Sequence, residues 1–295
     1  MTIKTNLFST LLVCTSLFLT SCAIDGHEPD EPITKAEDPS LSITPSKEVL
    51  RSFDIKFPHA KDIEWSVDGS YYVADFTEFS SATNAWFEQE GNWVSSKSSL
   101  TSSELNKEIH NAFLNSIYST NQLISRNRLE RKDLGDVYMI ETNNGAHNIN
   151  IYYTENGDFI KTVKNYGDYV DRPVEVSEKV NNMVTSHFTA AEILDVWEDS
   201  LSPKVGVMEN DTYKVATLNS EYDWVSTIWV VEEATVPEVV MNSFKTSPYG
   251  SVELNSIRIM ENSSDRSYLF YFFEGGKNKI ATLMASGLFI SIISY

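Results

Sequence analysis

The sequence predicts an α+β protein made of tandem repeats of a helix followed by a three- or four-stranded antiparallel β-meander, with the helices packed on one face of the sheet. Three observations lead to this class. Short amphipathic helical stripes recur along the chain, and hairpin turns such as Asn144-Gly145 and Asn156-Gly157 separate the alternating segments that follow them. The short links force neighbouring strands to pair antiparallel. A unit of about sixty residues has a marginal core, so two units are expected to share a sheet.

The first 21 residues have the features of an export signal. Lys4 precedes an apolar stretch, Leu7 to Leu19, that is too short to span a membrane. The segment Leu19-Thr20-Ser21-Cys22 resembles the lipobox of bacterial lipoproteins, in which cleavage precedes a cysteine that then carries lipid. We therefore predict a signal peptide over 1–21 and lipidation of Cys22, where three acyl chains would give a firm membrane anchor. An ordinary secretory signal followed by an unrelated cysteine is the alternative.

Residues 22–44 are predicted to be a disordered tether, because this acidic, proline-rich stretch cannot bury enough apolar surface to offset its ordering entropy. Its early acids resemble the export signal of some Gram-negative lipoproteins. We expect an outer membrane lipoprotein of a Gram-negative bacterium, facing the periplasm or the cell surface. With Cys14 removed and Cys22 lipidated, the mature chain has no thiol for a disulfide, a nucleophile or a metal.

The net charge of the chain is -19. Binding to nucleic acid or to anionic lipid requires clustered Lys and Arg, so this charge disfavours both partners. It suits a basic partner, or it serves solubility alone.

The repeats predict two domains after the tether. Helical stripes that contain Phe53, Phe113, Val184 and Phe244 are separated by 60, 71 and 60 residues. We place domain 1 at 45–172, with units 45–100 and 101–172, and domain 2 at 173–295, with units 173–234 and 235–295. Thr44 is the expected N-cap of the first helix. The third unit shows only two clear strands, 213–218 and 224–231, and we interpret the apolar stretch 280–295 as a buried hairpin.

A resemblance to a known family rests on three runs, FPHAKDIEW from Phe57, YYVADF from Tyr71 and NAWFEQEGNW from Asn84. They resemble the PepSY-like, β-lactamase-inhibitor-protein-like family of secreted and lipid-anchored bacterial proteins. The similarity is good over 49–99 and fair over 180–231. It implies a helix-plus-sheet fold and a tendency toward binding, and it carries no functional residue onto this chain. The second and fourth units depart from the pattern, because they lack its proline and tryptophans.

The residues give little support for catalysis, a metal or a cofactor. The five histidines are dispersed and none has the spacing of a metal-ligand pair: His27, His59, His110, His147 and His187. The chain has no nucleophile-elbow, phosphate-loop or dinucleotide-binding motif. We therefore expect a protein that is not an enzyme and has no cofactor.

Aromatic side chains on a polar strand face are the better lead. Trp86 alternates with Asn84 and Glu88, and Tyr152 lies among asparagines, so both are predicted on the face that water reaches. With Tyr71 as the third candidate, they would anchor a protein or stack on a sugar. The alternative is that they pack against a neighbouring unit or form cross-strand pairs.

Together these features predict a non-catalytic, lipid-anchored binding module of the bacterial envelope. It would bind or inhibit another secreted or envelope protein through an open β-sheet face. A glycan-binding accessory lipoprotein at the cell surface is the alternative, and the membrane would be contacted through the lipid on Cys22.

Overall fold

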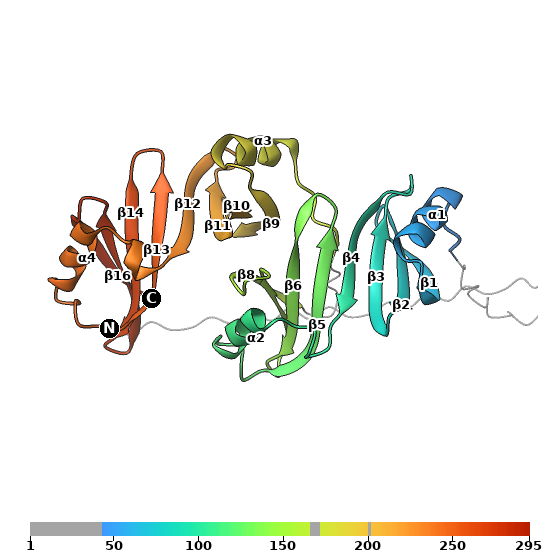
Figure 1. Ribbon diagram of the computed structural model, residues 1–295, viewed down its shortest axis with the longest axis horizontal. Helices are drawn as coiled ribbons and strands as arrows, with labels where there is room; N and C mark the ends of the chain where they lie inside the picture. The colour runs from blue at the N-terminus through green and yellow to red at the C-terminus, as the bar shows by residue number, and fades with distance from the viewer. Residues whose placement is uncertain (1–42, 166–171, 200–201) are drawn as a thin grey trace, which may run out of the picture. The chain divides into compact units, whose positions relative to one another are not determined.

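Two antiparallel sheets dominate the computed structural model, which describes residues 43–165, 172–199 and 202–295 (Figure 1). Each sheet has eight strands, and both sheets belong to one compact unit, Ser42–Tyr295. The predicted signal peptide, Cys22 and nearly all of the predicted tether lie outside the described residues. Among the described residues, no helix is long and apolar enough to cross a membrane.

Sheet 1 is formed in chain order, with each strand hydrogen-bonded to the next. Its strands are β1 (Lys61–Asp68), β2 (Tyr71–Glu78), β3 (Ser81–Phe87), β4 (Trp93–Ser99), β5 (Gln122–Arg131), β6 (Leu134–Asn143), β7 (Asn148–Tyr153) and β8 (Phe159–Asn165). Helix α1 (Lys47–Lys56) precedes β1, and α2 (Lys107–Leu114) connects β4 to β5. Strands β1 and β8 are therefore the two edges of this sheet.

Sheet 2 follows the same order in the second half of the chain. Its strands are β9 (Glu192–Asp199), β10 (Ser202–Glu209), β11 (Thr212–Leu218), β12 (Trp224–Val231), β13 (Leu254–Asn262), β14 (Arg266–Glu274), β15 (Lys277–Met284) and β16 (Phe289–Ser294). Helix α3 (Glu178–His187) precedes β9, whereas the 3-10 turn η1 (Glu233–Thr235) and helix α4 (Glu238–Lys245) connect β12 to β13. The edges of sheet 2 are β9 and β16.

The predicted α+β class is wrong, because the described residues are 51% strand and only 16% helix. Each of the four α-helices has eight to ten residues and buries two or three side chains. Helices this short cannot cover a face of eight strands. The protein is mostly antiparallel β-sheet with few helices, in place of the expected helix-and-meander repeats with helices on a sheet face.

Four strands that the sequence patterns did not reveal explain this error. Strands β5 and β13 pair with β4 and β12, and these pairings join consecutive four-stranded segments edge to edge. The other two are β9 and β10. In β10, Pro203 and Gly206 both disfavour strand structure in a sequence pattern. Helix α2 lies between β4 and β5 in the chain, so no hairpin turn in the sequence indicates that these strands pair.

The helix starts also differ from the expected positions. Helix α1 begins at Lys47, and Ser46 is its N-cap in place of Thr44, because the Ser46 hydroxyl accepts a hydrogen bond of 3.2 Å from the Val49 amide. Helix α2 is capped in the same way by Asn106, whose side chain accepts from the Ile109 amide at 2.8 Å.

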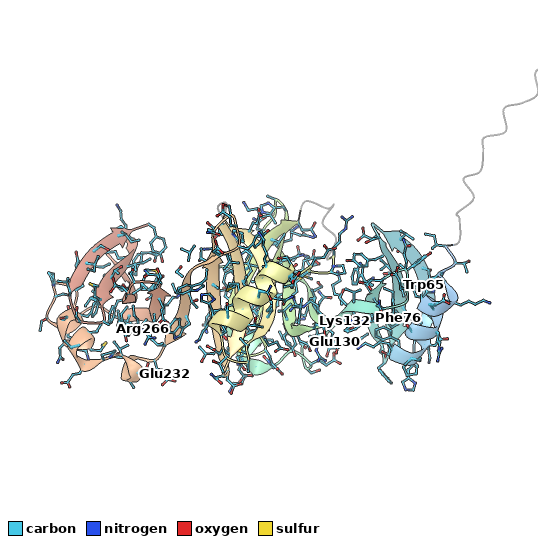
Figure 2. All side chains as sticks on the ribbon, turned by 90° about the horizontal axis from the view of Figure 1, so that it is seen from above. Trp65, Phe76, Glu130, Lys132, Glu232 and Arg266 are labelled. Carbon is cyan, nitrogen blue, oxygen red and sulfur yellow. The ribbon has the colours of Figure 1, made fainter. Side chains whose placement is uncertain are left out.

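An aromatic cluster joins α1 to the first strands of sheet 1. The ring of Phe53 lies 5.2 Å from Trp65 and 5.0 Å from Phe76, both edge-on, and 6.1 Å from Phe87. Figure 2 labels Trp65 and Phe76 beside α1. Since Phe57 also packs on Phe53 at 5.5 Å, the conspicuous aromatic run at 57–87 mainly builds this core.

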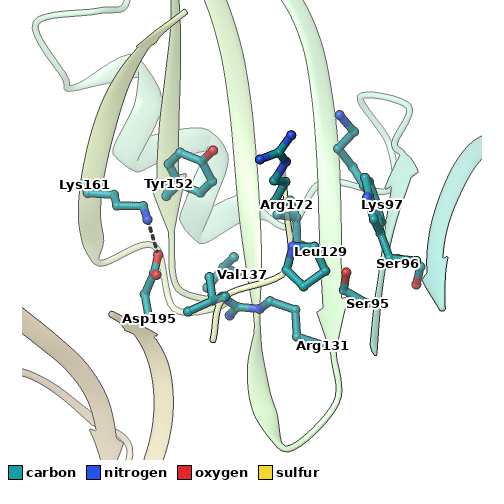
Figure 3. Close-up of a pocket in the computed structure, with 13 residues that line it drawn as sticks. Ser95, Ser96, Lys97, Leu129, Arg131, Val137, Tyr152, Lys161, Arg172 and Asp195 are labelled. Atoms are coloured by element: carbon teal, nitrogen blue, oxygen red, sulfur yellow. Dashed lines mark ion pairs between the residues drawn. The ribbon is translucent and has the colours of Figure 1, made fainter. Parts of the chain in front are cut away.

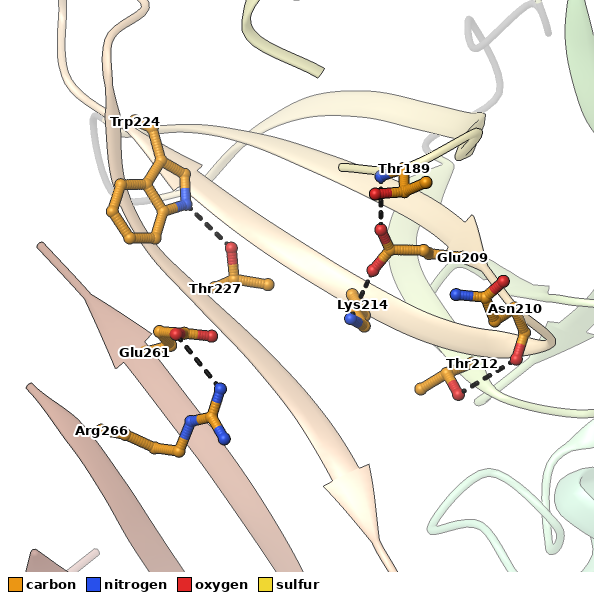
Figure 4. A network of polar contacts seen from close by, with 9 residues as sticks. All are labelled: Thr189, Glu209, Asn210, Thr212, Lys214, Trp224, Thr227, Glu261 and Arg266. Carbon is orange, nitrogen blue, oxygen red and sulfur yellow. Dashed lines mark hydrogen bonds and ion pairs between the residues drawn. The ribbon is translucent and has the colours of Figure 1, made fainter. Parts of the chain in front are cut away.

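A polar network holds the β10–β11 hairpin of sheet 2 (Figure 4). The Glu209 carboxylate accepts the Thr189 amide at 2.5 Å and forms an ion pair with Lys214 at 2.5 Å. The hydrogen bond from Lys214 lowers the pKa of Glu209. This carboxylate therefore ties the loop before β9 to the hairpin.

Candidate functional site

The two aromatic residues expected on an open face of sheet 1 are buried. Trp86 is 4% exposed and Tyr152 is 3% exposed. Tyr152 belongs to a hydrophobic cluster with Leu194 of β9, and Tyr213 of β11 packs against that cluster. These two residues therefore cannot anchor a partner at the surface, and for Tyr152 the alternative of packing against a neighbouring unit describes the structure.

The structure nevertheless brings Trp86 and Tyr152 to the same small pocket (Figure 3). The segment Arg172–Val174, which follows sheet 1 in the chain, contributes to its wall together with Asp195 of β9. Its volume of about 30 Å³ suits one or two water molecules. The pocket is thus a packing feature of the buried face and is too small for a peptide or a sugar.

Tyr71 does not line this pocket. It is half-buried, and its hydroxyl donates a hydrogen bond of 3.2 Å to Glu175. Burial, this hydrogen bond and the negative charge of Glu175 raise the pKa of Tyr71. In the same region Arg172 forms an ion pair with Asp68 at 2.6 Å, so Tyr71 helps to hold the segment that crosses sheet 1.

A charge cluster lies at the contact between the two sheets. Lys161 of β8 forms an ion pair of 2.9 Å with Asp195 of β9, which is almost fully buried. Arg131 of β5 is buried beside them and donates a hydrogen bond to the Gly135 carbonyl. Burial lowers the pKa of Arg131, while the charge of Asp195 opposes this shift. Asp195 of sheet 2 therefore attracts two cations of sheet 1, Lys161 and Arg131. This attraction holds the two sheets together.

Glycine at position 135 permits the close approach of β9 to β6. A methyl group there would overlap the Leu194 side chain and lie 2.8 Å from the Glu192 carboxyl carbon. We expect Gly135→Ala to lower the free energy of unfolding by about 1–3 kcal/mol, because the two strands must separate. Urea titration measures the loss. In the double variant with Leu194→Ala, the loss of unfolding free energy should be smaller than the summed losses of the two single variants. Losses that simply add would show that the contact with Leu194 is not the cause.

Sheet 2 has a partly exposed face that carries several large apolar residues, which we call the C-terminal open face. Residues directly opposite in an antiparallel sheet point to the same side, and the register places one set together across β12 to β16. Its apolar members and its arginine are Ile228, Val230, Arg258, Met260, Leu269, Tyr271, Phe273, Ile280, Met284 and Ile293. Its polar members are Ser226, Ser256, Asn262, Ser267, Asn278, Thr282 and Ser291. The alternating residues of these strands, such as Phe270 and Phe272, pack with α4 on the other side.

Large apolar side chains on this face remain in contact with water. Phe273 is 60% exposed and Ile293 is 54% exposed. On the same face, the Arg258 guanidinium lies 4.7 Å from the Tyr271 ring centroid. Burial raises the pKa of Tyr271, and the charge of Arg258 lowers it. The face thus presents an aromatic and arginine pair together with three exposed apolar side chains, those of Val230, Phe273 and Ile293.

A groove of about 560 Å³ continues this face toward β8. Ile228, Val230 and Arg258 line both the groove and the C-terminal open face. The remaining wall includes Tyr213 of β11 and Val163 of β8. The described residues contain no group of three or more His, Cys, Asp or Glu side chains that would hold a metal ion. Among the described surfaces, this face and its groove are therefore the best candidate for binding.

Comparison with known families gives a match to the family described as "Putative beta-lactamase-inhibitor-like, PepSY-like" over residues 70–161 and 204–272. These two stretches include more than half of the chain. The protein belongs to this family. The resemblance seen in the runs from Phe57 to Trp93 is therefore confirmed.

Solved structures with a similar chain come from Bacteroides. A BLIP-like protein from Bacteroides fragilis is 24% identical, with a TM-score of 0.42, and the match covers 44% of this chain and 94% of that one. DUF2874 family proteins from Bacteroides ovatus and Bacteroides uniformis are 27% and 26% identical; each has a TM-score of 0.40 and covers 42% of this chain, and 93% and 92% of their own chains are covered. No curated protein matches this chain.

Sequence reasoning missed the open face of this PepSY-like protein. The stretch 280–295 was expected to be a buried hairpin, but Ile290 and Ile293 are exposed. The sequence of β14 contained a signal for this face. Leu269, Tyr271 and Phe273 lie on one face of the strand, and the core face on its other side is also apolar. A strand that is apolar on both faces is buried on both faces or covered by a partner.

Proposed function

We propose that this PepSY-like protein is a non-catalytic binding module of the bacterial envelope that binds another protein through the C-terminal open face. The observation that carries the proposal is the Tyr271–Arg258 pair, which shares its face with the exposed apolar side chains of Val230, Phe273 and Ile293. Tyr, Phe, Met and Arg are the residue types enriched at the centres of protein interfaces. Met260 and Met284 add the adaptable apolar side chains of such a surface.

The chemistry of the face favours a protein over a sugar. Sugar binding depends on many hydrogen-bonding groups beside an aromatic platform. The exposed residues of this face are Val230, Phe273 and Ile293, which are hydrocarbon, and Asn278. Arg258 is the charged residue within the set that defines the face. Glycan binding, with the groove as its location, stays the alternative prediction.

The location of the module at the membrane is part of the same proposal. Cleavage after residue 21 and lipid on Cys22 would hold the protein at the outer membrane. The segment up to residue 44 would then give the module reach from the lipid surface, as an acidic, proline-rich tether does. Inhibition of a secreted enzyme is one outcome of such binding.

We expect Phe273→Ser to weaken binding of envelope proteins at least about tenfold, because the substitution removes an exposed aromatic anchor. The measurement is a pull-down from envelope extract, followed by titration of the recovered protein. Tyr271→Ala should have the same effect. The matched control is Phe79→Ser, which removes an even more exposed phenylalanine from the β2–β3 turn of sheet 1.

Two results would contradict the proposal. One is an extract from which the wild-type protein recovers nothing. The other is recovery of the same proteins, with the same affinity, by wild type and by both variants of the face. A loss caused equally by Phe79→Ser would move the binding surface to sheet 1.

A further inference from the structure

The four sheet edges differ in their protection against pairing with another chain. Strands β1, β8 and β9 carry charged residues, which discourage the addition of a further strand: Lys61, Asp62, Glu64 and Asp68; Lys161 and Lys164; Glu192, Asp195, Glu198 and Asp199. Strand β16 reads FISIIS and carries no charge. It also contains no proline, so β16 has the chemistry of a strand that pairs.

Exposure shows that the described structure leaves this edge uncovered. Ile290 is 52% exposed, and Phe289 and Ile293 are exposed beside it. On its inner side β16 pairs with β15, and the Tyr295 amide donates to the Asn278 carbonyl at 3.1 Å. Since antiparallel bonds alternate along a strand, the amides of Ser294 and Ile292 point away from β15.

We propose that β16 pairs antiparallel with β16 of a second copy of this chain, about a two-fold axis that passes through Ile292. In this register Ile292 faces Ile292 of the second copy, and Ser294 faces its Ile290. The outward amides and carbonyls of Ile292 then lie opposite those of the second copy, and the Ser294 amides face its Ile290 carbonyls. Because β16 has a bulge at Ile290, we expect about four hydrogen bonds. In this register even-numbered residues lie opposite even-numbered residues, and side chains opposite each other point to the same side of a sheet. The two C-terminal open faces therefore lie on the same side of one joined sheet.

Charge favours a second copy at this edge. The chain carries a net charge of -19, so two copies repel each other over most of their surfaces. Residues 280–295 contain no Asp, Glu, Lys or Arg. Two copies therefore meet the fewest charges when they approach along β16.

The size of the contact sets the expected affinity. A pair of six-residue strands buries less than the interface of a stable dimer, so we expect a dissociation constant of about 10 to 100 µM. Sedimentation velocity of the purified protein over about 1 to 200 µM covers this range. Ile290→Lys should raise the dissociation constant at least about tenfold, because it places two lysines at the joined edges.

Ser294→Pro tests the same contact through the backbone, since it removes an outward amide and leaves the bonds to β15 in place. Val239→Lys is the matched control: Val239 lies on α4 and is 51% exposed, close to the value for Ile290. It should leave the dimer unchanged. Phe273→Ser should also leave the dimer unchanged, which separates this proposal from the binding function of the open face.

Hydrogen exchange gives a readout at single residues. The amides of Ile292 and Ser294 should become more protected as the protein concentration rises, whereas the inward amide of Ile293 should be protected at every concentration. A monomer at all concentrations would overturn the proposal, as would a dimer that Ile290→Lys does not weaken. Protection of Ile292 that appears only in envelope extract would assign the edge to a different protein and would also reject a second copy.

Discussion

Asp195→Asn should lower the free energy of unfolding by about 3–5 kcal/mol. Asp195 is almost fully buried and lies 2.9 Å from Lys161, with the buried Arg131 beside them. Asparagine keeps the shape of the side chain and removes the negative charge that attracts Lys161 and Arg131. The loss is large because a buried cation without its partner retains its desolvation cost.

Urea titration of the two proteins at neutral pH measures this difference. Asp54→Asn, at an exposed position of α1, is the control and should change the free energy by less than about 0.5 kcal/mol. Adding Arg131→Met to Asp195→Asn should recover part of the loss, since the unpaired buried cation is then absent. A loss below about 1 kcal/mol would mean that Asp195 does not hold the sheets together as inferred here.

Phe53→Ala should lower the free energy of unfolding by about 3–5 kcal/mol. The Phe53 side chain is 2% exposed and contacts the rings of Trp65, Phe76 and Phe87. Alanine would leave a cavity between α1 and sheet 1, and rings held from opposite sides cannot collapse to fill it. The edge-on ring contacts would be lost as well.

Thermal and urea unfolding measure this loss, with Phe79→Ala as the control. Phe79 is 78% exposed, so its removal should change the free energy of unfolding by less than about 0.5 kcal/mol. Equal losses for the two variants would show that Phe53 is not a centre of the core. Helix α1 has only ten residues and buries only Val49 and Phe53, so Phe53 makes a large part of its contact with sheet 1.

The sequence predicted local features well. The glycine turns appear where expected, as at Gly157, which has a φ of +83°. The run from Phe57 to Trp93 indicated the family correctly. These features were readable because each depends on residues that are neighbours in the chain.

The sequence did not reveal how the strands combine. Strand β5 contains charged and polar residues at both parities, so its pattern does not indicate a strand in the middle of a sheet. The size of one unit indicated that two units share a sheet, but without β5 and β13 the pattern did not show which strands join them. The short helices therefore received too much weight in the fold class. The edge pairings that join these segments are long-range contacts, which no turn motif encodes.

The burial of Trp86 could not be predicted from its neighbours in the sequence. Alternation along β3 correctly separates Trp86 from the core that contains Phe87. Only the tertiary structure decides that Trp86 is nevertheless covered, on a pocket wall shared with Arg172–Val174. For the same reason the exposed face is found on sheet 2, around Tyr271 and Phe273. A strand pattern determines which residues share a face, but coverage of that face depends on segments far away in the chain.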